Sequence, residues 1–251
     1  MITAAIITKN EDANIERCLK SLGWVNEILI VDSGSIDNTL KICESYNCRI
    51  IKSDWLGFGK TKKFAVDSAN NDWILSIDAD EEISPALMDS IKNIDLSNID
   101  LAFKIKRISY YLGGRVLYSG WQNDYPIRFF NRKTANFNNK PVHEKVEINS
   151  DKVIEIKSPI FHYPYKNISE HIEKINSYTT LSSNMLFKEG KKVFLIYPFL
   201  ACFLKFIKVY FFRFGFLDGY RGIILCSLSA FYVYLKYIKL WSLDKDEDSS
   251  Y

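Results

Sequence analysis

Two aspartates, Asp78 and Asp80, lie one residue apart just after the apolar run Trp73–Ile77. Carboxylate oxygens are the ligands that Mg²⁺ and Mn²⁺ prefer in proteins, and such an ion also binds phosphate oxygens. A metal held here would neutralise the charge that develops on a departing diphosphate. The alternative is an acidic helix N-terminus, because a helix could begin near Ser84-Pro85 and attract the preceding carboxylates. The position directly after a buried strand favours the metal site.

Two more polar loops follow strand-like runs earlier in the chain. Their candidate contacts for a nucleotide are Thr8, Asn10 and Glu11 in the first loop and Asp32, Ser33 and Gly34 in the second. The Asp32 carboxylate would accept hydrogen bonds from a uracil or a ribose, and the turn after it supplies backbone donors. Each loop also has a purely structural interpretation, as an Asx-turn at Asp32 and as the N-cap of the next helix at residues 8–11.

The first hundred residues alternate strand and helix signals. Short apolar runs predict strands at residues 2–8, 27–31, 49–52 and 73–77, and helical spacing predicts helices at 14–22, from 37, and at 61–69. Repeated βα units imply a parallel sheet with right-handed crossovers, and such sheets bind ligands at the carboxyl ends of their strands. The three polar loops therefore converge on one sheet edge and form a pocket.

The pattern changes after residue 99 to shorter, aromatic-rich strands. These are predicted at residues 103–108, 127–130, 153–156 and 160–163. After Asn167 the chain becomes helical. The apolar residues that share one face of this helix are Ile172, Ile175, Tyr178 and Leu181. The last residues, from Asp244 on, have the composition of a solvated acidic tail.

The net charge of +3 conceals a strong asymmetry. Between Gly190 and Trp241 there are eight basic residues and one acid, so this segment carries +7 and the rest of the chain −4. The interleaved Phe, Tyr, Leu and Ile are too apolar for a nucleic-acid groove and fit an anionic membrane surface. The apolar stretches 193–204 and 222–235 are too short for a membrane span of ~20 residues. We therefore expect amphipathic helices in the membrane interface, with a packed helical subdomain or an oligomer interface as the alternative.

Five cysteines, at positions 18, 43, 48, 202 and 226, form no CxxC pair and show no ligand-like spacing. The odd count argues against a secreted disulfide framework. Met1 leads directly into a strand-like run without a basic or cleavable leader. We therefore expect no signal peptide and a reducing, cytosolic compartment.

The three loop sequences resemble the signatures of family 2 glycosyltransferases with the GT-A fold. These segments are Ile6-Ile7-Thr8-Lys9-Asn10-Glu11, residues 31–39, and Ser76-Ile77-Asp78-Ala79-Asp80-Glu81. Later segments are similar to the β-1,4-glucosyltransferases that build the lipopolysaccharide core. They are Trp55-Leu56-Gly57-Phe58-Gly59, Arg128-Phe129-Phe130-Asn131-Arg132, Val142-His143-Glu144 and Gly215-Phe216-Leu217-Asp218-Gly219.

This resemblance implies an α/β, mostly parallel GT-A domain that transfers a sugar, with glucose expected, from a UDP-sugar with inversion at the anomeric carbon. It implies that Asp32 contacts the base, Asp78 the ribose, and Asp80 the Mg²⁺ or Mn²⁺ ion. Ala79 belongs to the same donor-binding loop. Lys62 lies where the family often has a Gln-Lys-Asn run. Here the Gln and the Asn are replaced by Thr and Lys, which leaves the identity of the donor open.

An inverting transferase needs a carboxylate that takes the proton of the acceptor hydroxyl. Asp124 is the first candidate, because the family places a carboxylate between the acidic loop and an Arg-containing strand. Glu144 is the second candidate. The structural alternative for Asp124 is a loop residue that only turns the chain before Pro126.

Three further residues are candidate contacts for the acceptor: Trp121, Arg128 and His143. The Trp121 indole would stack on a sugar face, and Arg128 would bind an acceptor phosphate or simply flank a strand. His162 lies between two aromatic residues and is expected to be a core or edge histidine, with a metal ligand as the alternative.

We therefore predict four regions. Residues 1–98 are the nucleotide-sugar-binding half of a GT-A domain, 99–166 its acceptor-binding half, 167–243 amphipathic membrane-associating helices, and 244–251 an acidic tail. The predicted enzyme is a metal-dependent hexosyltransferase on the inner face of the cytoplasmic membrane, with a lipid-linked or lipopolysaccharide acceptor and no nucleic-acid partner. The rivals are transfer to polyprenyl phosphate, which needs no base, and a silent scaffold that binds nucleotide sugars. A nucleotidyltransferase is disfavoured because no Gly-rich phosphate loop follows the first strand.

Overall fold

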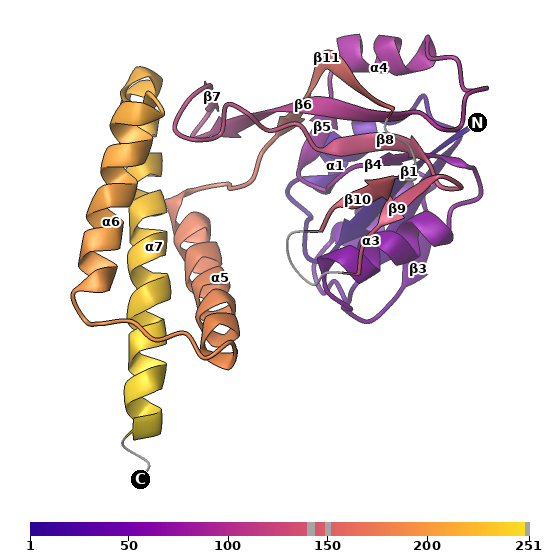
Figure 1. Ribbon diagram of the computed structural model, residues 1–251. Coiled ribbons are helices and arrows are strands. Elements are labelled where there is room, and N and C mark those ends of the chain that lie inside the picture. The colour runs from indigo at the N-terminus through magenta and orange to yellow at the C-terminus, as the bar shows by residue number, and fades with distance from the viewer. Residues whose placement is uncertain (140–143, 149–151, 249–251) are drawn as a thin grey trace. The chain divides into compact units, whose positions relative to one another are not determined.

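The computed structural model describes residues 1–139, 144–148 and 152–248. The chain divides into two compact units. The first consists of Met1–Ile108 and Asp124–Tyr163, and the second of Ser109–Asn123 and Pro164–Tyr251. The second unit therefore combines a short segment from the middle of the chain with the C-terminal part, as the colours of Figure 1 show.

The first unit is an α/β sheet domain. Its strands are β1 (Ile2–Thr8), β2 (Glu27–Asp32), β3 (Arg49–Lys52), β4 (Trp73–Ser76), β5 (Glu81–Ile83), β6 (Ala102–Tyr111), β8 (Ile127–Asn131), β9 (Ala135–Phe137), β10 (Val146–Ile148) and β11 (Val153–His162). Its helices are α1 (Ile15–Lys20), α2 (Thr39–Ser45), α3 (Phe58–Asp67) and α4 (Pro85–Lys92). The last three residues of β6 already belong to the second unit.

The predicted βα units form as expected. The strands β3, β2, β1 and β4 lie side by side, and the ladders between them are parallel, with Thr8 opposite Asp32 at the ends of β1 and β2. Because the carboxyl ends of these strands meet at one edge, the polar loops that follow them start close together. The predicted fold class, an α/β domain with a Rossmann-like sheet, is confirmed.

The rest of the sheet pairs in the antiparallel sense. Beyond β4 the order is β8, β6, β11 and β5, with antiparallel ladders between β4 and β8, β8 and β6, and β11 and β5. β9 and β10 form a separate two-stranded sheet. One prediction was wrong, because residues 153–156 and 160–163 are not two strands but parts of β11. Pro159 interrupts the apolar pattern, but pairing of residues 160–162 with β5 keeps the backbone extended.

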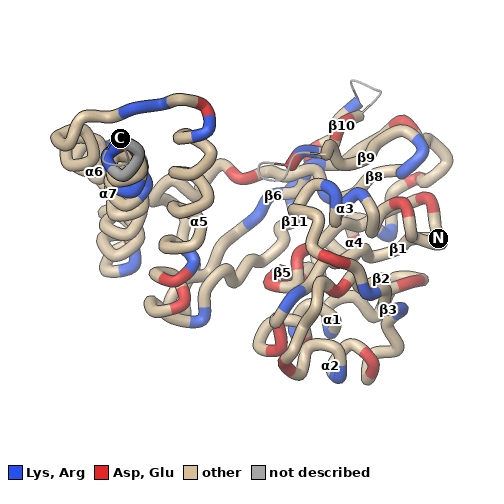
Figure 2. Tube along the Cα trace, turned by 90° about the horizontal axis from the view of Figure 1, so that it is seen from below, with Lys and Arg blue, Asp and Glu red and all other residues tan. Residues whose placement is uncertain are grey.

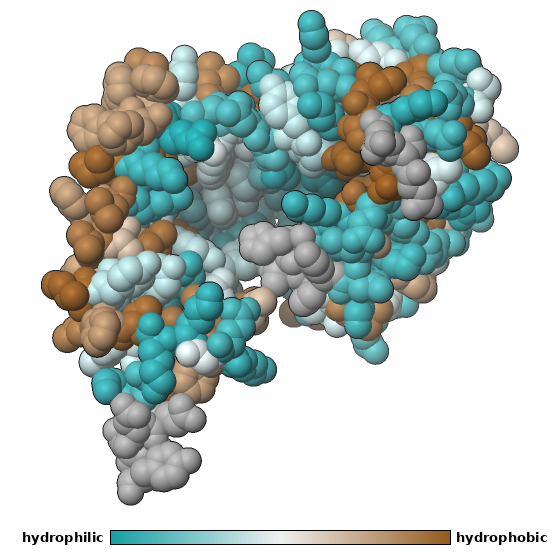
Figure 3. Space-filling view, in the orientation of Figure 1, coloured by the Kyte–Doolittle hydropathy of each residue, from teal (hydrophilic) through white to brown (hydrophobic). Residues whose placement is uncertain are grey.

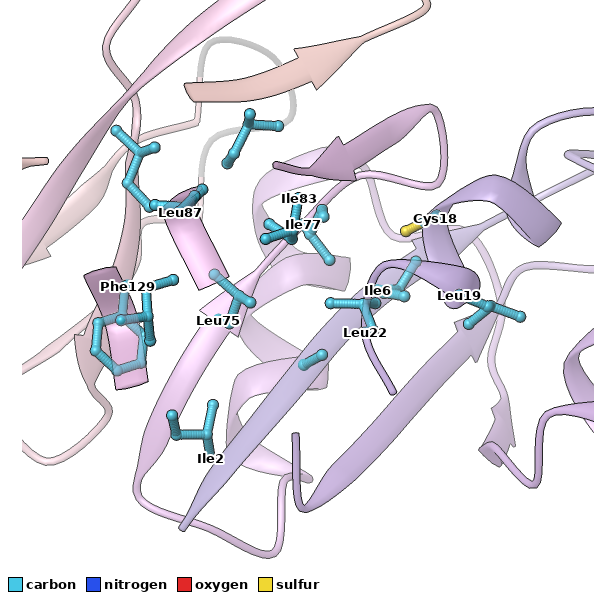
Figure 4. Packing of buried hydrophobic residues seen from close by; sticks show 14 of the residues in the cluster. Ile2, Ile6, Cys18, Leu19, Leu22, Leu75, Ile77, Ile83, Leu87 and Phe129 are labelled. Atoms are coloured by element: carbon cyan, nitrogen blue, oxygen red, sulfur yellow. The ribbon is translucent and has the colours of Figure 1, made fainter. Parts of the chain in front are cut away.

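Packing on both faces of the parallel strands holds their ends in place. On one face, Ile6 and Leu75 of the sheet pack with Leu19 of α1 and Leu87 of α4, all of them buried (Figure 4). On the other face, α3 covers the sheet through residues such as Ala65. Parallel sheets require such cover on both sides. The polar loops therefore leave from a rigid, close-packed support.

The second unit is helical. It contains the strand β7 (Gly114–Val116), the helices α5 (Ile168–Lys188), α6 (Tyr197–Ile207) and α7 (Gly219–Asp248), a π-helical turn η1 (Lys208–Phe212) and a 3₁₀ turn η2 (Gly215–Asp218). α7 lies between α6 and α5 in two views at right angles (Figures 1 and 2) and packs against both of them.

The start of α7 is tied to the segment 109–123 of the same unit. The Asp218 carboxylate accepts hydrogen bonds from the backbone N–H groups of Leu117 (2.9 Å) and Tyr118 (3.1 Å) and from the Ser119 hydroxyl (2.6 Å). Arg221 Nε donates to the carbonyl oxygen of Tyr111 at 3.0 Å. The Arg221 guanidinium lies close against Gly114, and a Cβ atom there would be 2.3 Å from its carbon, so the arginine side chain would have to move. The Gly215–Gly219 segment that resembles a family signature is thus a structural clamp.

The buried face of α5 differs from the prediction. The buried residues are His171, Ile175, Thr179 and Ser183, whereas Ile172, Tyr178 and Leu181 are exposed. The reason is that α7 offers polar partners to α5. Lys239 Nζ donates to the Thr179 hydroxyl at 2.9 Å, and the Ser182 and Tyr232 hydroxyls lie 3.1 Å apart. Small hydroxyl side chains of α5 therefore contact α7, where the spacing of apolar residues in the sequence predicted larger apolar side chains.

The C-terminal end also differs from the prediction. The apolar stretch 222–235 is the middle of the 30-residue helix α7, and Gly215–Lys245 is long and apolar enough to cross a membrane by length and composition alone. The expectation that this stretch is too short was therefore wrong. Asp244 is not in a solvated tail, because it is buried in α7 and lies 2.6 Å from Lys192 Nζ. The final residues, 249–251, lie outside the described part of the chain.

Candidate active site

The acidic loop leads from β4 into a strand and not into a helix. β5 begins at Glu81 and pairs with β11, and α4 begins only at Pro85. The N-cap of α4 is Ser84, whose hydroxyl accepts a hydrogen bond from the Leu87 N–H at 3.2 Å. The helix start expected near Ser84-Pro85 is therefore present, but its cap is Ser84, and Asp80 lies before the intervening strand β5.

Asp78 lies between two cations from different elements. Its Oδ1 atom is 2.9 Å from Lys62 Nζ on α3, and its Oδ2 atom is 2.5 Å from Arg128 Nη2 on β8. Burial alone would raise the pKa of the Asp78 carboxyl, but the charges of Arg128 and Lys62 outweigh it and hold this pKa well below its usual value. Asp78 is therefore a carboxylate anion at any physiological pH.

A second carboxylate, that of Glu81 at the start of β5, contacts the same arginine as Asp78. Its side chain is fully buried and accepts hydrogen bonds from Arg128 at 2.6 Å, from Arg107 at 3.1 Å and from the backbone N–H of Asp78 at 2.9 Å. Arg107 in turn lies 2.6 Å from Asp124. Through these contacts Glu81 connects the candidate donor residue Asp78 with the candidate base Asp124.

The sequence alone predicts no separate role for Glu81 or Arg107. Glu81 belongs to the acidic motif, and Arg107 lies in a strand that also contains Lys104 and Lys106. All three cations are partly exposed, and nothing in that run distinguishes the arginine from the lysines. Only the pairing of β6 with β8, which brings Arg107 toward the acidic loop, reveals its position.

A cleft of about 410 Å³ opens beside Asp78. Its charged lining residues are Lys62, Asp78, Arg107, Arg128, Glu144 and Lys145, and its other walls come from Tyr125, Pro126, Ile127, Phe137 and Val146. Glu144 Oε1 lies 2.9 Å from Lys62 Nζ, so this second candidate base shares a cation with Asp78. The cleft thus combines charged groups with aromatic and aliphatic walls, as sites for polar organic ligands do.

Asp80 faces a different partner. Its Oδ2 atom lies 3.5 Å from Nε2 of His162 on β11, and both side chains are partly exposed, by 19% and 15%. His162 was expected to be a core or edge histidine, and the structure brings it to the acidic loop. A carboxylate oxygen suits Mg²⁺ and Mn²⁺, and the added imidazole nitrogen suits Mn²⁺ better. The pair therefore fits a divalent ion whose remaining ligands come from outside the protein.

These two donors do not make a complete metal site by themselves. Within residues 1–139, 144–148 and 152–248, no group of three or more His, Cys, Asp or Glu side chains is arranged to hold an ion. An ion at Asp80 and His162 would need oxygen ligands from a diphosphate and from water, which is common for Mg²⁺ sites in phosphate-binding enzymes.

The Asp32 loop is closed by its own hydrogen bonds. The Asp32 carboxylate is 1% exposed and accepts from the N–H groups of Gly34 and Ser35, both at 3.0 Å. Asn10 links this loop to the first one, because its side-chain oxygen accepts from the Ile36 N–H at 2.9 Å. Gly34 has a φ of 88°, a conformation that favours glycine. Glu11 also acts locally, since its Oε2 atom accepts from Asn14 Nδ2 at 3.0 Å.

Two buried hydroxyl groups at this edge are left without hydrogen bonds in the described structure. They are Oγ1 of Thr8 and Oγ of Ser33. The Ser33 N–H donates to the Thr8 carbonyl oxygen at 3.0 Å, so the two residues are neighbours. Buried hydroxyls normally have a hydrogen-bond partner. A bound nucleotide would supply one.

Not every predicted site residue belongs to the described part of the sheet unit. Trp121 belongs to the second unit, where its ring lies 6.3 Å from Tyr111 and 6.5 Å from Tyr165. His143 lies outside the described residues. Ala79 is buried in the core, so only its backbone can contact a ligand. Lys62, Asp78, Arg128 and Glu144 do line one cleft, but their roles remain predictions.

The sheet unit thus has a parallel sheet with polar loops at its carboxyl edge, and one of these loops is acidic and faces a histidine. Residues 3–145 match the sequence profile of glycosyl transferase family 2, and the chain belongs to this family. The family predicted from the three loop sequences is thereby confirmed, and the protein is a glycosyltransferase.

Relatives along nearly the whole chain support the same family. An uncharacterized glycosyltransferase of Rickettsia typhi is 34% identical over 254 residues, which cover 96% of this chain and 87% of the relative. The lipopolysaccharide core biosynthesis glycosyltransferase LpsC of Rhizobium meliloti is 26% identical over 247 residues, covering 96% of this chain and 92% of LpsC. The resemblance to the lipopolysaccharide core branch is thus confirmed as a similarity of sequence.

A solved structure supports the fold. The mannosyltransferase PcManGT from Pyrobaculum calidifontis, in complex with GDP-Man and Mn²⁺, matches 95% of this chain and 86% of its own with a TM-score of 0.52. Its sequence is only 13% identical, so the likeness concerns the fold. It agrees with the GT-A class that the loop sequences predicted.

Proposed function

We propose that this protein is an inverting, metal-dependent hexosyltransferase that moves a sugar, with glucose expected, from a UDP-sugar to a lipid-anchored saccharide. The observation that carries the proposal is the division of the acidic loop, in which Asp78 pairs with Lys62 and Arg128 while Asp80 faces His162. The similarity to LpsC supports an acceptor of the lipopolysaccharide inner-core type. The expected location is the inner face of the cytoplasmic membrane.

The donor would lie across the carboxyl edge of the parallel strands. The unsatisfied hydroxyls of Thr8 and Ser33 and the backbone around Asp32 and Gly34 would bind the uridine. Asp32 holds the shape of this loop, because its carboxylate is already occupied by loop N–H groups. Asp78 would accept a hydrogen bond from the ribose, with Lys62 and Arg128 keeping it ionised.

Asp80 and His162 would hold the divalent ion. Bound there, the ion supplies Lewis-acid stabilisation of the diphosphate leaving group. Mn²⁺ in the PcManGT complex belongs to that protein, and support for an ion here comes from the donor atoms of Asp80 and His162. Lys62, which is 2.9 Å from both Asp78 and Glu144, would add positive charge near the departing phosphates.

The transfer itself would be one in-line displacement. Asp124 takes the proton of the acceptor hydroxyl while the oxygen attacks the anomeric carbon. The bond from that carbon to the diphosphate oxygen breaks, and the configuration inverts. Arg107 orients the Asp124 carboxylate through a 2.6 Å contact and is itself held by Glu81. Glu144 is the second candidate for the base, since it lines the cleft.

A donor screen tests this proposal. The purified chain would be incubated with UDP-, GDP- and dTDP-sugars with and without Mn²⁺, and hydrolysis of the donor measured. We expect metal-dependent hydrolysis of a UDP-sugar that falls at least about 100-fold in Asp80→Ala, because the charge on the leaving group is then unsupported. The matched control is Asp89→Ala, which removes an exposed carboxylate on α4. Unchanged hydrolysis in Asp80→Ala would refute the metal assignment, and no hydrolysis of any donor by a chain that still binds UDP in calorimetry would favour the scaffold.

A further inference from the structure

Exposed apolar side chains are concentrated in one stretch of the helical unit. Of the thirty large apolar residues that are exposed in the described part of the chain, fifteen lie within residues 194–223. They include Phe194, Phe203 and Phe212, which are 86%, 62% and 74% exposed. In Figure 3 brown side chains gather along the α6 side of this unit. Soluble monomers rarely expose so large a continuous apolar surface, so this face has a partner.

The same stretch carries positive charge. Residues 190–223 contain six basic side chains and one acid, Asp218. The Asp218 carboxylate is occupied by two backbone N–H groups and the Ser119 hydroxyl of its own unit. Lys208 and Arg213 are exposed among the aromatic residues, and Figure 2 marks the basic positions along the trace. An apolar face with basic side chains at its margin is complementary to an anionic lipid surface.

The helix α5 exposes polar side chains such as Glu173, Asn176 and Asn184 next to apolar ones such as Leu181, and it packs along α7. The contact is specific, because Lys239 Nζ on α7 donates to the Asn176 carbonyl oxygen at 2.8 Å and to the Thr179 hydroxyl at 2.9 Å. A bilayer-spanning α7 would therefore carry the polar surface of α5 into hydrocarbon. Burying such groups without partners costs several kcal/mol each.

The helix α6, which exposes Phe199, Leu200 and Phe203, is too short to span a bilayer. α6 has 11 residues, which at ~1.5 Å per residue give a length of about 16 Å. The hydrocarbon core of a bilayer is about 30 Å thick. α6 can therefore bury its apolar side only by lying along the membrane surface.

We propose that residues 194–223 form an in-plane membrane anchor, which embeds the apolar side of α6, η1 and η2 in the interface of an anionic bilayer. α7 then stays parallel to the surface and does not cross it, although its length and composition would allow a span. The inference rests on the proposed function only for the choice of a membrane as the partner. Vesicle binding needs neither donor nor acceptor, so its failure would leave the transferase proposal intact.

Flotation of the purified full chain with vesicles tests the surface. The chain should bind vesicles containing phosphatidylglycerol much more tightly than neutral phosphatidylcholine vesicles, and added salt should weaken the binding. Lys208→Gln with Arg213→Gln should lower the partition coefficient about 30-fold, since each basic residue near an anionic surface contributes a factor of about five. Phe203→Ser should lower it about 20-fold.

Two matched variants control for general effects. Leu181→Ser removes an apolar side chain that is 57% exposed on α5, close to the 62% of Phe203, and Lys188→Gln removes an exposed cation of the same helix. Neither should change binding by more than twofold. Equal losses in the Phe203 and Leu181 variants would overturn the proposal. So would concentration-dependent dimerisation without vesicle binding, because the partner would then be a second copy of the chain.

Thiol labelling distinguishes an in-plane anchor from a span. Single cysteines would be placed at Arg115, beside the start of α7, and at Ser242, near its end, in a chain with Cys48 and Cys202 replaced by Ser. An impermeant maleimide should label both cysteines in inverted membrane vesicles and neither in spheroplasts. Labelling of the two positions from opposite sides would show that α7 crosses the bilayer and would overturn the proposal.

Discussion

The two units differ in where their basic side chains lie. In the sheet unit, Lys62, Arg107 and Arg128 are drawn inward, and each lies within about 3 Å of at least one carboxylate. In the helical unit, Lys208 and Arg213 stay on the surface among aromatic side chains. One buried titratable group of this unit, His171, has a pKa that burial lowers to about 4, so the imidazole is neutral.

This difference separates two uses of the same residue types. A buried ion pair is costly to desolvate and seldom stabilises a fold more than apolar packing would. We therefore expect that buried ion pairs beside a cleft, such as those in the sheet unit, act on a bound ligand. Surface cations at the edge of an apolar face lose little hydration and act on an extended anionic surface. This contrast agrees with the two proposals, a small anionic substrate for the sheet unit and a membrane for the helical unit.

The largest expected effect concerns the most exposed carboxylate of the buried network, Asp124, which is 38% exposed beside Arg107. Asp124→Asn keeps the shape but cannot accept the acceptor proton, so kcat for transfer should fall about 10²–10⁴-fold. UDP binding, measured by calorimetry, should stay within a factor of two. Asp100→Asn, at an exposed loop position, is the control. Full activity in Asp124→Asn would show that this ion pair is structural and would point to Glu144 or to an acceptor that is already anionic.

The next effect tests whether the buried charges of the sheet unit depend on one another. Arg128→Met leaves Asp78 and Glu81 without their shared cation and should lower the free energy of unfolding by about 3–5 kcal/mol. Urea denaturation followed by circular dichroism measures it. Arg132→Met removes a partly exposed pair with Asp72 and should cost no more than about 1 kcal/mol. If the two variants lost the same free energy of unfolding, buried and exposed ion pairs would contribute equally and the comparison would fail.

The smallest effect concerns the neutral interior of the helical unit. The unfolded chain protonates His171 near pH 6.5, whereas the folded unit protonates it only near pH 4. As the pH falls below 6.5 the unfolded state binds the extra proton, so stability is full above this pH and decreases by up to about 1.4 kcal/mol per pH unit below it. Urea midpoints at pH 7.5 and 5.5 should differ more in the wild type than in His171→Leu. An unchanged difference in that variant would assign the pH dependence to other groups.

The sheet unit was largely predictable because its signals are local. Buried parallel strands are apolar runs, and the loops at their ends carry polar residues, so Thr8, Asp32 and Asp78 could be placed at one edge without coordinates. The antiparallel half was less predictable. β11 was split in two at Pro159, because a pattern along the chain does not show that β5 lies beside it.

The site residues that escaped prediction are those whose partners are distant in sequence. Glu81 and Arg107 are 26 residues apart and meet only after β6 has been placed in the sheet. His162 reaches Asp80 through the pairing of β11 with β5. In the helical unit, the apolar period suggested a face with Leu181, but hydroxyl contacts to α7 selected Thr179 and Ser183 instead. A single sequence carries no local signal for such contacts.

The origin of the second unit in two separate segments has a consequence for how the protein is made. Tyr111 and Val116 pack with Leu225 of α7. After residues 109–123 have been synthesised, the ribosome must therefore add roughly another hundred residues before this hairpin can pack against α7. At the usual speed of translation this takes roughly 5–20 s. During that time the apolar side of the hairpin is open to chaperones and proteases. A premature stop after β11 would therefore release a sheet unit with an unprotected hairpin, and not a smaller soluble enzyme.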